Sequence, residues 1–335
     1  MDNLTHTLTG IMLSRAGLGR WSPRASVLMA LAANVPDIDV LWGIPFGTAA
    51  YLDVHRGFSH GVATIPLMAA LPVALVGLWR RPPNFPWLRA WTLAIVAVAS
   101  HLLLDLTNIY GIRLGSPFSQ TWYRLDWTNV VDPWIWAVLL LGVVWPMLAG
   151  LVSSEIGAKS KAGPGIARFA LAFLILYEGG RWLLHGRAVE TLAARIYAHG
   201  TPRRVMAMPS AWSPLRWRGL VETGAAWQVV PIDLTAEFDP AEGQVFYKPD
   251  PNPWIERARA TGPFQALERF SSTLFWRVTP LPELDGGVEV AAGDIRFGDP
   301  GSGAFQATAR FRRDGSLVES RFGFGAPPGD RLRVR

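Results

Sequence analysis

The chain of 335 residues contains no cysteine. This absence excludes disulfide bonds and thiolate metal sites, so any metal ion must be bound by histidine, carboxylate or backbone oxygen. Charged residues are also scarce, at 17%, against 50% hydrophobic residues. Because soluble domains carry about 25% charged residues, part of this chain is expected to lie in a lipid bilayer.

The net charge of +6 does not indicate a nucleic-acid-binding protein. The basic residues are scattered along the chain, whereas a nucleic-acid site gathers them into a patch. No nucleic acid is therefore expected as a partner. The first residues, 1–6, show neither a basic leader nor a small-residue cleavage site, and we expect no cleaved signal peptide there.

Long apolar runs predict about four membrane spans, since roughly 20 apolar residues cross a bilayer as a helix. The predicted spans cover residues 61–79, 91–105, 134–152 and 166–184. Two shorter apolar runs, 4–18 and 25–33, precede them and predict a helical hairpin too short to cross the bilayer. The amino-terminal half is thus predicted to be a helical membrane bundle.

Beyond residue 200 the pattern changes to alternating apolar and polar residues. Segments of this kind, separated by Asp-Gly and Gly-Asp turns, predict antiparallel strands at 227–234, 273–278, 287–290 and 305–311. The predicted fold class is an α-helical membrane bundle of about four spans plus a short N-terminal helical hairpin, followed by a small antiparallel all-β domain. The predicted boundaries are 1–190 for the membrane-embedded helical domain and 200–335 for the soluble β domain, whose protein partner is unknown.

The distribution of basic residues predicts the orientation in the membrane. On one predicted side lie nine of them: Arg15, Arg20, Arg24, Arg80, Arg81, Arg89, Lys159, Lys161 and Arg168. The opposite short segments contain three: Arg56, Arg113 and Arg124. By the positive-inside rule the first side is cytoplasmic. We therefore predict a multi-pass protein of the inner (cytoplasmic) membrane with its β domain on the extracytoplasmic side.

His101 and Asp105 interrupt the second predicted span. Residues four apart lie one above the other on a helix, so the imidazole and the carboxylate can face one point. An uncompensated carboxylate at bilayer depth costs several kcal/mol. Taken alone, the pair is equally compatible with a metal site and with a structural hydrogen bond inside the bundle.

Other histidines and acids fall at the same predicted membrane level and favour the metal site. The candidate ligands are His6, Asp37, Asp39, His60, His101 and Asp105. Imidazole and carboxylate suit Zn²⁺ or another divalent metal such as Mn²⁺ or iron, and the set is large enough for one or two ions. Taken singly, each polar residue in a turn is also explained as a cap or turn former.

Such an ion activates water for attack on a phosphoryl or acyl centre. The candidate catalytic residues are Asp37, Asp39, Asp105 and Asp132, as ligands or as general base. Arg56 and Arg124 are the candidate substrate-binding residues, because the planar guanidinium group pairs with phosphate or carboxylate.

Five separated motifs, in this order, resemble those of the YdjM-type membrane-bound metal-dependent hydrolases. They are residues 1–6 (MDNLTH), 34–39 (NVPDID), 55–60 (HRGFSH), 101–105 (HLLLD) and 131–133 (VDP). More remotely, the order of ligands is similar to that of zinc-dependent phospholipase C and the single-strand nucleases. The further histidines that complete the other zinc site of those enzymes have no evident counterpart here. The resemblance implies phosphoester hydrolysis, with the lipid bilayer as a partner and a lipid or other amphiphile as substrate.

Two alternatives from other classes use the same residues differently. A transporter or ion-handling membrane protein would employ the intramembrane acids as a relay. A non-catalytic envelope protein would use the polar cluster to stabilise the bundle and the β domain to bind a partner. We detect no inverted repeat of the kind that many transporters carry.

Overall fold

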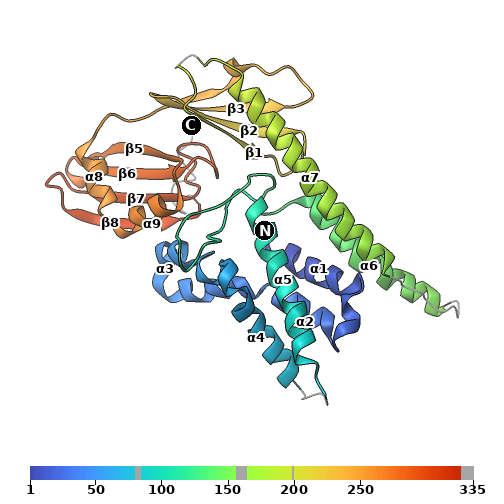
Figure 1. Cartoon of the computed structure of the whole chain (residues 1–335). Helices are drawn as coiled ribbons and strands as arrows, with labels where there is room; N and C mark the ends of the chain where they lie inside the picture. Colours follow the sequence, from blue (N-terminus) through green and yellow to red (C-terminus); the bar gives the residue numbers. More distant parts are fainter. Residues whose placement is uncertain (80–83, 156–163, 198–199, 326–335) are drawn as a thin grey trace. The chain divides into compact units, whose positions relative to one another are not determined.

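The computed structural model describes residues 1–79, 84–155, 164–197 and 200–325. Figure 1 shows a helical amino-terminal part followed by two small sheets. The helices are α1 (Asn3–Arg15), α2 (Ala25–Ala32), α3 (Val40–Val54), α4 (Ile65–Leu78), α5 (Trp87–Thr107), α6 (Pro133–Glu155), α7 (Gly165–Ala193), α8 (Pro253–Arg259) and α9 (Gly262–Phe270). The strands are β1 (Arg204–Pro209), β2 (Arg216–Glu222), β3 (Ala226–Asp233), β4 (Gln244–Tyr247), β5 (Leu274–Leu281), β6 (Gly287–Asp294), β7 (Gln306–Phe311) and β8 (Leu317–Gly323).

The chain divides into two compact units. The helical unit comprises residues 1–39, 56–186 and 209–215, and the second unit comprises 40–55, 187–208 and 216–335. The helix α7 continues from the first unit into the second. Helix α3, which lies between the second and third motifs (residues 34–39 and 55–60), therefore belongs with the sheets and not with the bundle.

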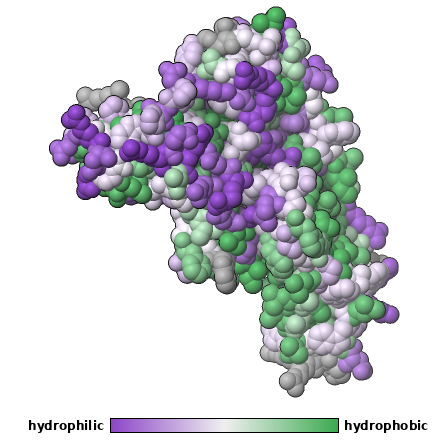
Figure 2. Space-filling view, turned by 60° about the vertical axis from the view of Figure 1, so that its left-hand side comes forward, coloured by the Kyte–Doolittle hydropathy of each residue, from purple (hydrophilic) through white to green (hydrophobic). Residues whose placement is uncertain are grey.

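Two helices in the described part of the chain, Trp87–Thr107 and Pro133–Val152, are long and apolar enough to cross a membrane. A third span is present if the bent pair Pro45–His60 and Val62–Leu78 counts as one. The predicted fourth span forms part of α7, where Arg168, Glu178 and Arg181 interrupt the apolar run. Figure 2 shows hydrophobic side chains over the helical unit, in keeping with a surface that faces lipid.

The described residues of the helical unit form two apolar cores. One packs α2, α4 and α5 together around side chains such as Leu28 and Leu93. The other packs α1, α6 and α7 around Met12, Leu139 and Leu174. Helices α1 and α2 approach closely at Gly10. A Cβ atom at this position would lie only 2.5 Å from the Met29 carbonyl oxygen. The predicted N-terminal hairpin is thus confirmed, and glycine permits its close packing.

The second unit contains two four-stranded sheets, of order β1-β2-β3-β4 and β5-β6-β7-β8. Neighbouring strands from β2 to β4 and from β5 to β8 pair antiparallel, as the alternating pattern predicts. The short helices α8 and α9, which the pattern does not predict, lie between the two sheets in sequence. Helix α3 is joined to this unit by two hydrogen bonds of Asp53 with Arg269, at 3.0 and 2.6 Å, and by one from Thr48 to the Phe322 carbonyl at 2.6 Å.

The predicted domain boundaries at residues 190 and 200 stay a prediction. The sequence pattern does not indicate that α3 belongs to the unit that contains the sheets. Of the nine basic residues that predict the cytoplasmic side, four lie outside the described residues: Arg80, Arg81, Lys159 and Lys161. The orientation therefore rests on the sequence pattern.

Gly10→Ala is expected to lower the free energy of unfolding by about 1–3 kcal/mol, because the added methyl group forces α1 away from the α2 backbone. Thermal unfolding in detergent, followed by tryptophan fluorescence, measures this change. The matched control is Gly150→Ala, where no described atom lies within 4 Å of the added Cβ, and we expect a change of at most about 1 kcal/mol. Equal stability of the two variants would contradict the close packing of α1 on α2.

Candidate metal centre

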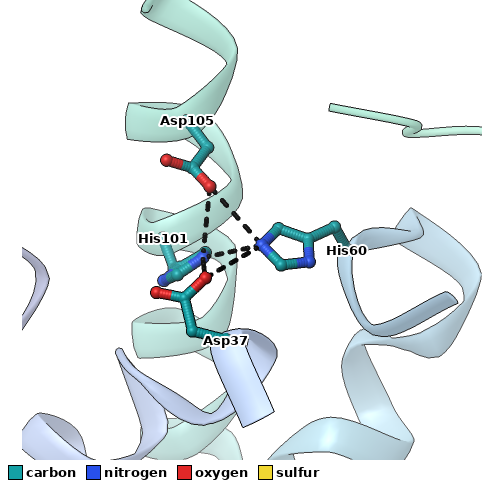
Figure 3. Close-up of side chains that lie close together, drawn as sticks. All are labelled: Asp37, His60, His101 and Asp105. Atoms are coloured by element: carbon teal, nitrogen blue, oxygen red, sulfur yellow. Dashed lines mark hydrogen bonds and ion pairs between the residues drawn. The ribbon is translucent and has the colours of Figure 1, made fainter. Parts of the chain in front are cut away.

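Four side chains from three parts of the helical unit converge on one point (Figure 3). Helix α5 provides His101 and Asp105, which are four residues apart and fully buried. The 3-10 turn Val35–Asp39, which follows the end of α2 at Ala32, provides Asp37. A second 3-10 turn, Phe58–His60, provides the buried His60. Side chains on short turns and on one helix face are thus brought together by the packing of α2, α4 and α5.

Four of five distances between ligand atoms of this group match a tetrahedral metal site, and the distance between the two imidazole nitrogens is shorter. His60 Nε2 lies 3.4 Å from Asp37 Oδ1 and 3.4 Å from Asp105 Oδ2. His101 Nε2 lies 3.6 Å from Asp37 Oδ1, 3.3 Å from Asp105 Oδ2 and 3.1 Å from His60 Nε2. Ligand atoms at about 2.0–2.2 Å from a tetrahedral ion are separated by about 3.3–3.6 Å. We call this set, Asp37, His60, His101 and Asp105, the metal-binding cluster.

Hydrogen bonds at the far side of each ring fix the two imidazoles. His101 Nδ1 lies 2.7 Å from the Ala33 carbonyl oxygen, which can only accept a hydrogen bond, so Nδ1 carries the proton. The Ser59 hydroxyl donates to Asp39 Oδ2 at 2.8 Å, which leaves its oxygen to accept from His60 Nδ1 at 2.9 Å. Both Nε2 atoms therefore direct lone pairs toward the same point, where a cation would compensate them.

The two carboxylate oxygens of Asp105 have different surroundings. Oδ1 lies 3.0 Å from an Arg56 guanidinium nitrogen, accepts from Asn108 at 3.2 Å and contacts the Met1 ammonium group. Oδ2 is buried and has no hydrogen-bond donor among the described residues. It lies 3.4 and 3.3 Å from the Nε2 lone pairs of His60 and His101, so the donor set fits a divalent cation at this point.

His6 lies beside the cluster without being one of its four members. Its ring stacks on that of His101, with centroids 3.8 Å apart, and its Nε2 lies 3.4 Å from Asp105 Oδ1. Its Nδ1 is buried and has no hydrogen-bond partner in the part of the chain that the structure describes. Burial lowers the pKa of His6 well below its ordinary value, so the ring is neutral. A ligand role for His6 stays a prediction.

Asp39 supports the cluster from behind His60. Its Oδ2 accepts from the Arg56 backbone amide at 2.9 Å and from the Ser59 hydroxyl at 2.8 Å. The carboxylate thereby fixes the turn that presents His60. Sequence reasoning treats Asp37 and Asp39 alike, whereas the structure brings the Asp37 side chain into the cluster.

The predicted catalytic residue Asp132 lies at the start of α6. Its Oδ1 accepts from the backbone amides of Trp134 and Ile135, at 3.0 and 3.3 Å, and its Oδ2 from the Tyr177 hydroxyl at 3.0 Å. Burial raises the pKa of Asp132 above its ordinary value. These contacts are those of a helix cap, and a catalytic role for Asp132 stays a prediction.

The two predicted substrate-binding arginines lie in different surroundings. Arg56 is buried, pairs with Asp105 and lies over the Tyr110 ring at 4.6 Å. Arg124 forms an ion pair with Asp126 at 3.1 Å. Arg56 thus neutralises one side of the metal-binding cluster, and substrate binding by either arginine stays a prediction.

Sequence reasoning missed three groups that orient the cluster: Ser59, Asn108 and the Ala33 carbonyl. Ser59 directly precedes His60, and Asn108 follows Asp105 by three residues, so the spacing alone could have indicated both. The Ala33 carbonyl is brought in by the packing of α2 on α5 and leaves no signal in the sequence.

Comparisons with known proteins find a family and a relative of this chain. A family model described as YdjM inner membrane protein matches residues 1–188, which include the whole metal-binding cluster. The uncharacterized protein YfhP of Bacillus subtilis (strain 168) is 31% identical over 156 residues, which are 43% of this chain and 46% of YfhP. The match thus covers less than half of that relative. No solved structure matches the chain.

Asp105→Asn is expected to reduce bound metal from about one ion per chain to traces, because the neutral amide group is a much weaker metal ligand than the negatively charged carboxylate. Elemental analysis of protein purified in detergent without chelator measures the content. The control is Asp126→Asn, a carboxylate outside the metal-binding cluster at a positive φ of 57° that asparagine tolerates. Full metal content in Asp105→Asn, or no metal in the unaltered protein, would contradict the site.

Ser59→Ala is expected to weaken metal affinity by about 10–100-fold, because His60 Nδ1 loses the hydrogen bond that orients its ring. Competition with a chromophoric chelator measures the affinity. Ser100→Ala is the control, because its hydroxyl bonds to the Ala97 carbonyl within α5 and contacts no cluster residue that we describe. An unchanged affinity in Ser59→Ala would show that the ring is held by other contacts.

Proposed function

The chain belongs to the YdjM inner membrane protein family, and we propose that it is a membrane-bound, metal-dependent hydrolase that cleaves a phosphoester of a lipid or other amphiphile. The observation that carries this proposal is the convergence of two imidazole nitrogens and two carboxylate oxygens at tetrahedral spacing. A catalytic zinc site typically has three protein ligands and an open position. The metal-binding cluster meets this requirement if Asp37 is a ligand that can be displaced.

The proposed metal is Zn²⁺, since imidazole with carboxylate at these distances suits this ion and the chain has no thiolate. When bound, a divalent cation polarises a phosphoryl oxygen and makes water a nucleophile near neutral pH. One ion at the metal-binding cluster accounts for the geometry. The candidate ligands also allow a second ion, and His6 would have to be one of its ligands.

The residues of the chain have distinct roles in this proposal. Asp37 has 9% of its side chain exposed, whereas His60, His101 and Asp105 have none, so water and substrate would arrive from the side of Asp37. Asp37 is therefore the carboxylate placed to accept a proton from the attacking water. Arg56 compensates the charge of Asp105, and Asp39 acts through Ser59 to orient His60. These two are positioning residues.

The proposed location is the inner membrane, with the metal-binding cluster and the β domain extracytoplasmic. The family consists of inner membrane proteins, and α5 and α6 are apolar enough to span. Arginine and lysine are more frequent in the segments predicted to be cytoplasmic than in the opposite segments, which supports an extracytoplasmic metal-binding cluster.

Zinc-loaded protein in nanodiscs is expected to hydrolyse bis(p-nitrophenyl) phosphate or phosphatidylglycerol, and His101→Ala is expected to lose activity by about 10²-fold or more together with its metal. Removal of zinc with EDTA should abolish hydrolysis and added Zn²⁺ should restore it. His185→Ala, which alters a histidine of α7 outside the metal-binding cluster, serves as the control.

Absence of phosphoester hydrolysis by fully metal-loaded protein would overturn the proposed reaction. Flux of ions across liposomes without hydrolysis would favour the transporter alternative. Loss of thermal stability in His101→Ala, without any hydrolysis in the unaltered protein, would favour a structural role of the metal-binding cluster.

A further inference from the structure

An apolar groove of about 500 Å³ lies within the helical unit, between α1, α5 and α7. Its walls include Leu13, Leu103, Leu104, Leu171, Leu174 and Trp127. The volume falls within the range of about 300–1,000 Å³ typical of small-molecule sites. An α-helix is about 10 Å in diameter with its side chains, so the volume of the groove holds little more than one helical turn. The size of the groove therefore favours a slender ligand over a partner helix.

One end of the groove carries polar side chains. Ser100, Leu103, Leu104 and Leu106 line the groove along α5, and Thr107 lines it at the end of that helix, together with Glu178 of α7. The Thr107 hydroxyl donates to Glu178 Oε1 at 3.2 Å. Trp127, in the loop after α5, also lines the groove, and tryptophan is typical of the headgroup level. The groove thus has a polar end at Thr107 and Glu178, while leucines predominate along the rest of α5, where the Ser100 hydroxyl bonds to the Ala97 carbonyl of the same helix.

Two polar atoms in the groove lack hydrogen-bond partners. Thr9 is 3% exposed, and its Oγ1 has no partner within the described ranges. Glu178 Oε2 is also buried and has no hydrogen-bond partner among the described residues. A buried polar atom without a partner is unfavourable, and an absent ligand is one of its ordinary explanations. The carboxylate oxygen of Glu178 suits a ligand that offers a hydrogen-bond donor.

We propose that this groove binds one lipid of the bilayer, with a hydrocarbon chain along the leucine walls and a donor of its headgroup at Glu178. The groove is open to the surface at its rim, where Leu103 is 64% exposed and Ile175 is 72% exposed. Helix α5 is also long and apolar enough to cross a membrane. Hydrocarbon chains of the bilayer therefore lie against the opening. This lipid site is separate from the metal-binding cluster and does not depend on hydrolysis.

Photo-crosslinking in nanodiscs tests the site. The probes are phosphatidylethanolamine, whose ammonium group donates hydrogen bonds, and phosphatidylcholine, whose headgroup has no N–H or O–H donor, each with a diazirine in one acyl chain. We expect phosphatidylethanolamine to label the groove residues of α5 and α7 at least fivefold more than phosphatidylcholine does. Peptide mapping by mass spectrometry locates the labels.

Leu174→Trp is expected to reduce this labelling at least fivefold, because the larger ring fills the groove. Leu171→Trp fills the same groove from one turn earlier and provides a second variant if the first is unstable. Leu176→Trp is the matched control, since Leu176 lies on the same helix, is 75% exposed and is not part of the groove lining. Bound metal per chain, measured in every variant, reports whether the helical unit is intact.

Glu178→Leu is expected to remove the preference for phosphatidylethanolamine over phosphatidylcholine, because the acceptor for the ammonium group is lost. Labels spread evenly over the exposed faces of the helices, or unchanged labelling in a folded Leu174→Trp protein, would overturn the proposal. Equal labelling by the two lipids in the unaltered protein would also overturn it. Loss of hydrolysis with intact labelling would leave the lipid site standing and reject only the proposed reaction.

Discussion

The buried carboxylate of Asp105 is the constraint on which the helical unit depends. A charge at this depth is unfavourable unless other groups compensate it. Arg56, Asn108 and the Met1 ammonium group surround Oδ1, while Oδ2 has no hydrogen-bond donor among the described residues and lies beside the Nε2 atoms of His60 and His101. Protein groups therefore compensate one side of the carboxylate, and the candidate metal site lies on the other.

The second unit provides a direct comparison, because it also buries an aspartate. Asp294 is 1% exposed, and its Oδ1 accepts from the Thr273 hydroxyl at 2.7 Å and the Arg296 amide at 3.0 Å. Its Oδ2 accepts from the Arg296 guanidinium at 2.9 Å. Both oxygens of this carboxylate have donors, as expected of a structural ion pair. Asp105 differs because its Oδ2 lies beside the lone pairs of two imidazole nitrogens and not beside a hydrogen-bond donor.

The sequence predicted the parts of this site that depend on local spacing. His101 and Asp105 share a helix face because they are four residues apart, and the turn at Pro36 presents Asp37. The side chain of Arg56 could not be placed in this way, because its partner Asp105 lies 49 positions later in the chain. The same limit applies to α3, which joins the sheets through Asp53 and Thr48 although its neighbours in sequence belong to the bundle.

Helix α5 connects the metal-binding cluster with the groove because its two faces differ. With 3.6 residues per turn, His101 and Asp105 project from one side, while Leu103 and Thr107 project from a face more than a quarter turn away. The ligand face is sealed by the turns that carry Asp37 and His60, so imidazoles and acids are kept from the hydrocarbon. The other face keeps its apolar residues open toward the bilayer. A single rigid helix can thus hold cation ligands at fixed spacing and still offer a lipid-facing surface, because each task uses a different set of its residues.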